Sequence, residues 1–236
     1  MLASYPPSVT GLQVERFVCG RVRSNAYVLS DPQGGALLVD AGMGAAQQVI
    51  ATVDARRLRP QAVVLTHGHP DHIWTARQLS ERYDIPTYIH ADDLSWFSDP
   101  ATGEHVAVVR YAGRALGRVR RIRPKRLTVV ADGQRVLAGP FSVDVLHTPG
   151  HSKGSVCLRV GGLCFAGDTI FRGNVGAVYL GGDRGTLGES IRAKLLPLPD
   201  DVRLLPGHGA ETTVGAERAG WERFLGGRSV RSEGES

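Results

Sequence analysis

The stretch VVLTHGHPDHIW, residues 63–74, decides how the rest of the chain is interpreted. It places three of the chain's 8 histidines and one aspartate between positions 67 and 72, in the pattern H-x-H-x-D-H. The residues before this pattern are apolar and β-branched, which predicts a buried strand over 61–69, and those after it predict a helix over 73–84. The histidines therefore lie in a loop at the end of a strand, where alternate side chains can converge on one point.

Imidazole and carboxylate groups in one loop are typical of a metal site. Neutral imidazole suits zinc and iron, and an adjacent carboxylate extends the choice to manganese. Because a catalytic zinc needs only three protein ligands and a water, four such residues together indicate two metals. A two-metal site needs further ligands, and the sequence offers His151 in HTPGHSKGS, Asp168 in FAGDTIF and His208 in LPGHGA. A surface cluster or a satisfied core histidine explains any one of these residues, but not all of them in matching contexts.

The rest of the chain alternates short apolar strands with helices, which predicts an α/β fold in which helices cover a sheet. A hairpin is expected at 26–30 and 35–42, helices at 44–58 and 186–198, a second hairpin at 154–169, and a strand at 202–210. The two halves are similar in pattern: LLVDAG corresponds to LCFAGD, and VVLTHGH to RLLPGHG. We therefore predict one internally duplicated domain over residues 1–225, followed by a disordered polar tail over 226–236.

Composition places the chain among ordinary globular proteins, with 42% hydrophobic and 22% charged residues. The N-terminal residues lack the pattern of a signal peptide, and no apolar run is long enough to span a membrane. The 3 cysteines have no metal-type spacing, and so sparse a count favours a reducing compartment. These features predict a cytoplasmic protein that does not bind membranes. The basic stretch 110–126 is interpreted as a solvated helix face and turn in preference to a nucleic-acid surface.

The motifs THGHPDH, TPGHSKGS, FAGDTIF and LPGHG, in this order, resemble those of the metallo-β-lactamase superfamily, and within it the short hydroxyacylglutathione hydrolase (glyoxalase II-like) branch. The resemblance extends from NAYVL and LVDAG to the last of these motifs. It implies a four-layer αβ/βα sandwich with the metal site at one edge of the two sheets. It also implies two divalent metal ions, zinc in the first instance and iron or manganese as alternatives. The implied ligands are His67, His69 and His151 for the first ion, Asp71, His72 and His208 for the second, and Asp168 as the bridge between them.

Such a site favours hydrolysis by a metal-bridging hydroxide. Two cations about 3.5–4 Å apart lower the pKa of a bridging water toward neutrality, and a metal stabilises the oxyanion that forms when hydroxide attacks a carbonyl. We expect the substrate to be a small-molecule thioester of the hydroxyacyl-thiol type, or an ester, and we assign Asp71 the further catalytic role of orienting the hydroxide. Superfamily members that hydrolyse β-lactams usually carry Cys or Ser in place of Asp168, which argues against antibiotic hydrolysis.

The substrate-binding residues are predicted from the stretch GDTIFRGNVGAVYLGGD. Tyr179 matches a substrate-binding tyrosine of the longer glyoxalase II enzymes, but Ala177 stands where those enzymes have a lysine. Only 28 residues follow His208 in this sequence, so we expect most of the helical domain that grips glutathione in those enzymes to be absent. Arg172 is a candidate for binding a substrate carboxylate.

Three other functions stay open. The first is an Fe(II) persulfide dioxygenase that holds a single iron, although Gly176-Ala177-Val178-Tyr179 replaces the Gly-Arg-Thr-Asp run of that branch. The second is a lactonase or another ester hydrolase, although Phe171 replaces a tyrosine typical of quorum-quenching lactonases. The third is an RNA-processing nuclease, which the basic stretch would support and the missing RNA-binding arm argues against. The sequence does not determine the oligomeric state.

Overall fold

The computed structural model describes residues 11–97, 122–178 and 182–226, and every structural statement below refers to these residues. Tyr179, most of the basic stretch 110–126 and the tail from residue 227 onward lie outside them. The predictions made for those segments, including the substrate-binding role of Tyr179 and the disordered tail, therefore stay predictions. So does the prediction of a single duplicated domain over residues 1–225.

The first half of the chain forms a six-stranded sheet whose strands lie side by side in chain order. Its strands are β1 (Gln13–Cys19), β2 (Ser24–Ser30), β3 (Gly35–Val39), β4 (Arg59–Val64), β5 (Thr87–His90) and β6 (Leu127–Val130). The pairs β1–β2 and β2–β3 are antiparallel, and the later pairs are parallel. Parallel neighbours need a crossover connection, which α1 (Ala45–Ala55) provides between β3 and β4 and α3 (Ala76–Tyr83) provides between β4 and β5.

The second half forms another six-stranded sheet, in the order β14-β13-β10-β9-β8-β7. Its strands are β7 (Arg135–Ala138), β8 (Phe141–His147), β9 (Val156–Val160), β10 (Leu163–Gly167), β13 (Arg203–Pro206) and β14 (Thr212–Thr213). The small hairpin β11 (Ile170–Phe171) and β12 (Asn174–Val175) follows β10, and α5 (Arg184–Ser190) and α6 (Val214–Gly226) complete this half. Among the described strands of this sheet, only β10 and β13 pair in parallel. They contain the stretches whose pattern corresponds to β3 and β4, which are also a parallel pair.

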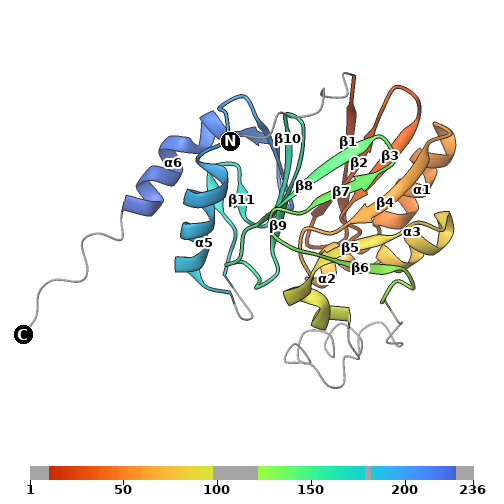
Figure 1. Ribbon diagram of the computed structural model, residues 1–236, viewed down its shortest axis with the longest axis horizontal. Coiled ribbons are helices and arrows are strands. Elements are labelled where there is room, and N and C mark those ends of the chain that lie inside the picture. The colour runs from red at the N-terminus through yellow and green to blue at the C-terminus, as the bar shows by residue number, and fades with distance from the viewer. Residues whose placement is uncertain (1–10, 98–121, 179–181, 227–236) are drawn as a thin grey trace, which may run out of the picture.

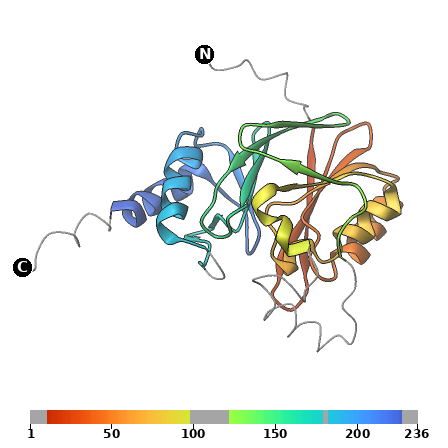
Figure 2. The ribbon, with the colours of Figure 1, turned by 60° about the horizontal axis from the view of Figure 1, so that its bottom comes forward.

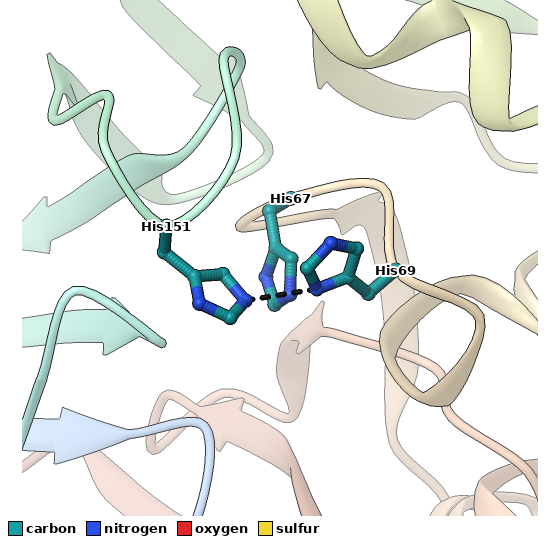
Figure 3. Close-up of side chains that lie close together, drawn as sticks. All are labelled: His67, His69 and His151. Carbon is teal, nitrogen blue, oxygen red and sulfur yellow. Dashed lines mark hydrogen bonds between the residues drawn. The ribbon is translucent and has the colours of Figure 1, made fainter. Parts of the chain in front are cut away.

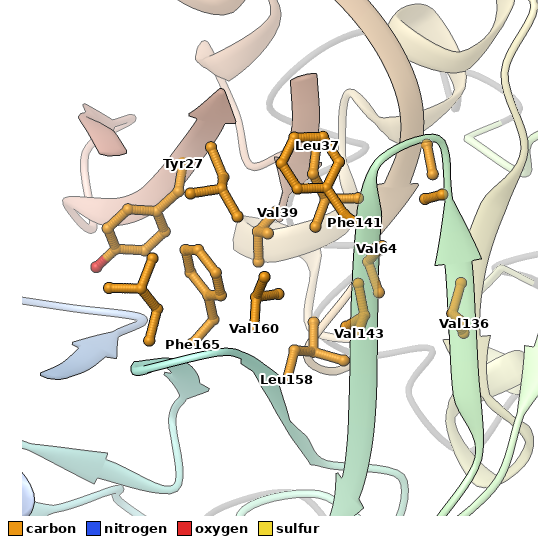
Figure 4. Close-up of a cluster of buried hydrophobic side chains, with 14 of the residues drawn as sticks. Tyr27, Leu37, Val39, Val64, Val136, Phe141, Val143, Leu158, Val160 and Phe165 are labelled. Carbon is orange, nitrogen blue, oxygen red and sulfur yellow. The ribbon is translucent and has the colours of Figure 1, made fainter. Parts of the chain in front are cut away.

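The two sheets face each other, with α1 and α3 on the outer side of one and α5 and α6 on the outer side of the other (Figure 1; a second view is given in Figure 2). Alternate residues of a strand point to opposite faces of its sheet. Because one face packs against the other sheet and the opposite face against helices, the inner strands must be apolar on both faces. Thus Leu29 packs between the sheets, whereas its neighbour Val28 packs against the helices. Figure 4 shows the layer between the sheets, where Tyr27 meets Phe165 edge to face at 5.3 Å. The predicted four-layer αβ/βα sandwich is confirmed.

Several predicted boundaries were wrong, and the structure shows the physical reason for each. The helix expected at 73–84 is two helices, α2 (Pro70–Ile73) and α3, because Thr75 turns toward β3 and donates both its N–H and its hydroxyl to the carbonyl of Ala41, at 2.7 and 3.0 Å. The helix expected at 44–58 ends at Ala55, since Arg57 adopts the left-handed conformation (φ 53°). The helix expected at 186–198 begins earlier, at Arg184, and passes into the π-helical turn η2 (Ile191–Leu195).

The three cysteines are buried and free. In the described part of the chain, no helix has the length and apolar character that crossing a membrane requires.

Candidate metal centre

Loops from both halves of the fold bring the seven predicted ligand residues to one edge of the two sheets. The first half contributes the loop after β4 together with α2, and the second half contributes the turns that follow β8, β10 and β13. The residues carried there are His67, His69, Asp71, His72, His151, Asp168 and His208. Their side-chain nitrogen and oxygen atoms form overlapping clusters that could hold metal ions. The structure therefore assembles every ligand candidate that the sequence indicated.

The first ligand group consists of His67, His69 and His151, whose candidate ligand atoms all lie within 4.8 Å of one another. Figure 3 shows the three rings converging from two loops, with His151 opposite the other two. The Nε2 atom of His151 is 2.8 Å from Nδ1 of His69. The two ring nitrogens are close enough to bind one ion, because a ring nitrogen that carries no proton is the atom through which imidazole binds a metal.

Hydrogen bonds fix the orientation of two rings in this group. Thr66 donates its hydroxyl proton to the carboxylate of Asp40 at 2.8 Å, so its oxygen accepts from Nδ1 of His67 at 3.1 Å. Nδ1 of His151 donates to the carbonyl of Ala177 at 2.6 Å. In the neutral form of each ring, these contacts place the proton on Nδ1 and leave the lone pair of Nε2 as the candidate metal ligand, as partners of metal-binding histidines do.

The environment of His67 fits a metal ligand. The residue is fully buried, and its Nε2 atom has no hydrogen-bond partner among the described residues. Burial first, and the neighbouring imidazoles second, hold the pKa of His67 well below its usual value. The ring is therefore neutral at physiological pH, and its buried lone pair is left for a cation.

The second ligand group consists of Asp71, His72 and His208. The carboxylate oxygen Oδ2 of Asp71 lies 3.4 Å from Nε2 of His72 and 3.2 Å from Nε2 of His208. Burial alone would raise the pKa of Asp71, but hydrogen bonds from the two imidazoles hold it far below its usual value. Burial would lower the pKa of both histidines, but nearby carboxylates raise it. The carboxylate is therefore charged at neutral pH, and the two rings keep their protons to higher pH than free imidazoles do, so protons compete with a metal ion at this group.

Asp168 lies between the two groups. Its Oδ1 atom is 3.5 Å from Nε2 of His72, and its Oδ2 atom is 3.5 Å from Nε2 of both His151 and His208. The side chain is 8% exposed, and Oδ1 has no hydrogen-bond partner among the described residues. A Cβ atom on Gly207 would approach this oxygen to 2.0 Å, so only glycine leaves room for the carboxylate here.

Asp40 is a functional residue that the sequence interpretation missed. Its carboxylate accepts from Nδ1 of His72 at 2.8 Å and from the hydroxyl of Thr66, so it reaches both ligand groups. Asp40 is 2% exposed and has a positive φ of 58°, which is rare outside glycine. The signal was present in LVDAG, where a charged residue ends an otherwise apolar strand. The carbonyl of Ala177 was missed because no side-chain pattern marks a backbone acceptor.

Arg172 does not join the seven residues. It is exposed and lines a groove of about 740 Å³ between the β11–β12 hairpin and α6, together with Arg203 and Glu217. The adjacent Phe171 is nearer to the centre, with its ring 5.8 Å from that of His208. A substrate-binding role for Arg172 stays a prediction.

A smaller group of His90, Asp92 and His147 lies apart from the centre. The two rings are stacked at 3.9 Å with an angle of 13° between their planes. Nearly parallel rings cannot both direct in-plane lone pairs at one ion. Nε2 of His147 donates to the carbonyl of Lys153 at 2.9 Å, which suits a structural role.

A four-layer sandwich with a His/Asp cluster at one edge of its sheets defines a class of metal-dependent hydrolases. The model of the metallo-beta-lactamase superfamily matches residues 19–208, and the chain belongs to this superfamily. The chain is 41% identical over 208 residues to an uncharacterised protein of Mycobacterium leprae (86% of this chain, 94% of the relative). It is 36% identical to the probable metallo-hydrolase YqgX of Bacillus subtilis (91% and 98%). It is 30% identical to the hydroxyacylglutathione hydrolase GloC of Haemophilus influenzae (83% and 90%).

Two solved structures give the same result. BLEG-1, a B3 metallo-beta-lactamase, aligns with a TM-score of 0.77 and 32% identity, covering 88% of this chain and 97% of that one. TTHA1623 in a di-iron-bound form aligns with a TM-score of 0.72 and 34% identity, covering 86% and 96%. The protein is therefore a metal-dependent hydrolase of the metallo-β-lactamase superfamily, and the resemblance found in its motifs is confirmed.

Proposed function

We propose that this protein is a binuclear metallohydrolase that cleaves a thioester of the hydroxyacyl-thiol type. In this proposal, His67, His69 and His151 hold one divalent ion, and Asp71, His72 and His208 hold the other. The observation that carries it is the position of Asp168, whose two oxygens contact histidines of both groups at 3.5 Å. The relative named as a hydroxyacylglutathione hydrolase supports the thioester as substrate.

The residues of the chain provide the arrangement that hydrolysis needs. When bound, the two ions supply Lewis acidity and an activated water. Asp168 keeps the two groups together, and Asp40 and Ala177 orient histidines by accepting their Nδ1 protons. Hydrolysis adds water across the C–S bond and yields a carboxylate and a thiol, so no protein nucleophile is required.

The exposure of the ligand candidates indicates how the substrate approaches. The side chains of Asp71 and His208 are 22% and 27% exposed, whereas that of His72 is fully buried. The open side of the centre is therefore that of Asp71. Its carboxylate is placed to accept a hydrogen bond from the attacking hydroxide and so to orient it, which is the catalytic role that we assign to it.

We propose zinc as the metal that both groups bind. Iron is the alternative that a related structure in a di-iron-bound form supports, and His/Asp donor sets also accept manganese.

The test is a substrate panel on protein reconstituted separately with zinc and with iron. We expect thiol release from S-lactoylglutathione and from a small S-lactoyl thioester, with less turnover of a simple lactone or a cephalosporin. Oxygen consumption with glutathione persulfide, without thiol release from either thioester, would instead indicate the persulfide dioxygenase. A panel in which the cephalosporin or the lactone is preferred by more than tenfold would contradict the proposed substrate class.

A further inference from the structure

Asp93 is buried beside the metal centre, although it belongs to none of the ligand-bearing loops. It lies in the 3₁₀ helix η1 (Ala91–Phe97), which follows β5, and it is 1% exposed. Its Oδ2 atom accepts from the backbone N–H of Gly68 and from the hydroxyl of Ser152, both at 2.7 Å, and its Oδ1 atom accepts from the N–H of Gly154 at 2.9 Å. One carboxylate thus binds three donors.

These three donors belong to the two loops that carry the first ligand group. Gly68 lies between His67 and His69, and Ser152 directly follows His151. The first loop comes from the first sheet and the second from the other sheet. Because 82 residues separate His69 from His151, the chain itself does little to hold these rings together.

The glycines at these positions show how closely η1 approaches both loops. A Cβ atom on Gly68 would lie 2.2 Å from the indole of Trp96, and one on Gly154 would lie 2.7 Å from Asp93. The Trp96 ring also meets the ring of His69 edge to face at 4.8 Å. One short helix therefore contacts both loops of the first ligand group.

We propose that Asp93 is a positioning residue that holds the two loops of the first ligand group at the distance that metal binding requires. Hydrogen bonds to a carboxylate are shorter and stronger than those between neutral groups, so three of them fix the loops before any ion arrives. Without the carboxylate, an ion must order the loops as it binds, and its affinity falls. This inference rests on the proposed metal-binding role of the three histidines.

Zinc affinity of the metal-free protein, measured by competition with a chelator, tests the inference. The measurement is made in a His208→Ala background, which reports the first group, and in a His69→Ala background, which reports the second. We expect Asp93→Asn and Asp93→Ala to weaken zinc binding at the first group by roughly 10–100-fold, as loss of such partners does in other metal sites. Binding at the second group should change much less.

Asp93→Asn is the more informative variant because asparagine has nearly the same size as aspartate. Its amide oxygen can still accept from Gly68 and Ser152, but its NH₂ group then faces the N–H of Gly154, so one hydrogen bond is replaced by a repulsion. The matched control is Asp92→Ala, which removes a neighbouring carboxylate that is 54% exposed. This control should bind zinc as the parent does.

A second readout separates positioning from simple stability. In the metal-free protein, hydrogen exchange at the amides of Gly68 and Gly154 should become faster in Asp93→Asn while exchange in the strands stays unchanged. If Asp93→Ala does not fold, Ser152→Ala removes one of the three donors and should weaken the first group in the same direction. Combined with Asp93→Asn, its effect should be less than additive, because both act through one carboxylate.

The results distinguish this inference from the proposed function. If the parent binds zinc at the first group and folded Asp93→Asn binds it equally well, Asp93 is only a structural residue and the inference is overturned. If the parent itself binds no zinc at His67, His69 and His151, the proposed function fails and the inference fails with it.

Discussion

The two ligand groups differ in how their side chains are held. In the first group, His67 and His151 are buried and each donates its Nδ1 proton to a fixed oxygen acceptor. In the second group, only His72 is held in this way, by Asp40, while Asp71 and His208 are about a quarter exposed. The first group is thus held by more hydrogen bonds from the protein, and the second is the more exposed to solvent, on the side from which we propose that substrate approaches. We expect the first group to bind its ion more tightly.

The largest effect is expected at the residue that the two groups share. Asp168→Ala removes the carboxylate that contacts both groups, so it should lower thioester hydrolysis by roughly a thousandfold, at the upper end of what single catalytic groups contribute. Steady-state thiol release checks this. Asp144→Ala, which breaks an exposed ion pair with Arg135, is the control and should leave the rate unchanged. A rate in Asp168→Ala within a few fold of the parent would contradict the shared role.

Asp40→Ala should have the next largest effect, and it should fall unequally on the two groups. The substitution removes the carboxylate that accepts the Nδ1 proton of His72, and it disturbs His67 indirectly through Thr66. We expect the second group to lose about 10–100-fold in metal affinity, and the first group to lose less. Chelator competition at each group measures the difference. An equal loss at both would mean that Asp40 supports the centre as a whole.

Lowering the pH should release the second ion before the first. Nearby carboxylates raise the pKa of His72 and His208, whereas burial and neighbouring imidazoles lower that of His67. A group with a raised pKa keeps its proton to higher pH, so metal binding there must displace protons and weakens by up to about tenfold per proton for each pH unit. Metal content measured from pH 8 to 5 should fall from two ions to one before it reaches zero. Simultaneous loss of both ions would contradict the proposed difference in pH dependence between the two groups.

The smallest effect is expected at Arg172, which lies outside both groups. If its groove receives part of an anionic substrate, Arg172→Ala should raise KM about three- to tenfold and leave kcat unchanged, as loss of uniform binding does. Arg203→Ala, in the same groove but paired with Glu211, is the matched comparison. An unchanged KM for every thioester would contradict a substrate-binding role for Arg172.

The sequence predicted the fold and the seven ligand candidates that the structure brings together, because both depend on local patterns. The pattern His67-Gly-His69 directly after an apolar strand indicates metal binding within a few residues. The order of the four motifs implied the other ligand candidates. Asp40 and Asp93 were not predicted, since their importance depends on which loops meet them in space. A single aspartate at a strand end, or in ADDLSWF, carries no signal of the donors it will bind.

The helix boundaries failed for a related reason. Periodicity over 73–84 indicated one helix, but a tertiary hydrogen bond from Thr75 to Ala41 divides it. The division fixes the short α2, which holds Asp71 and His72 beside the loop of His67. Contacts between distant segments thus determine how the predicted ligands are arranged, although local sequence determines which residues they are.

The most direct test of the account is the number of metal ions bound per folded chain. Native mass spectrometry of the reconstituted protein should show two ions in the parent, one in His208→Ala, and full retention of both in the Asp144→Ala control. A parent that saturates at a single ion, with all seven candidate ligands intact, would contradict the binuclear centre on which the proposed hydrolysis depends.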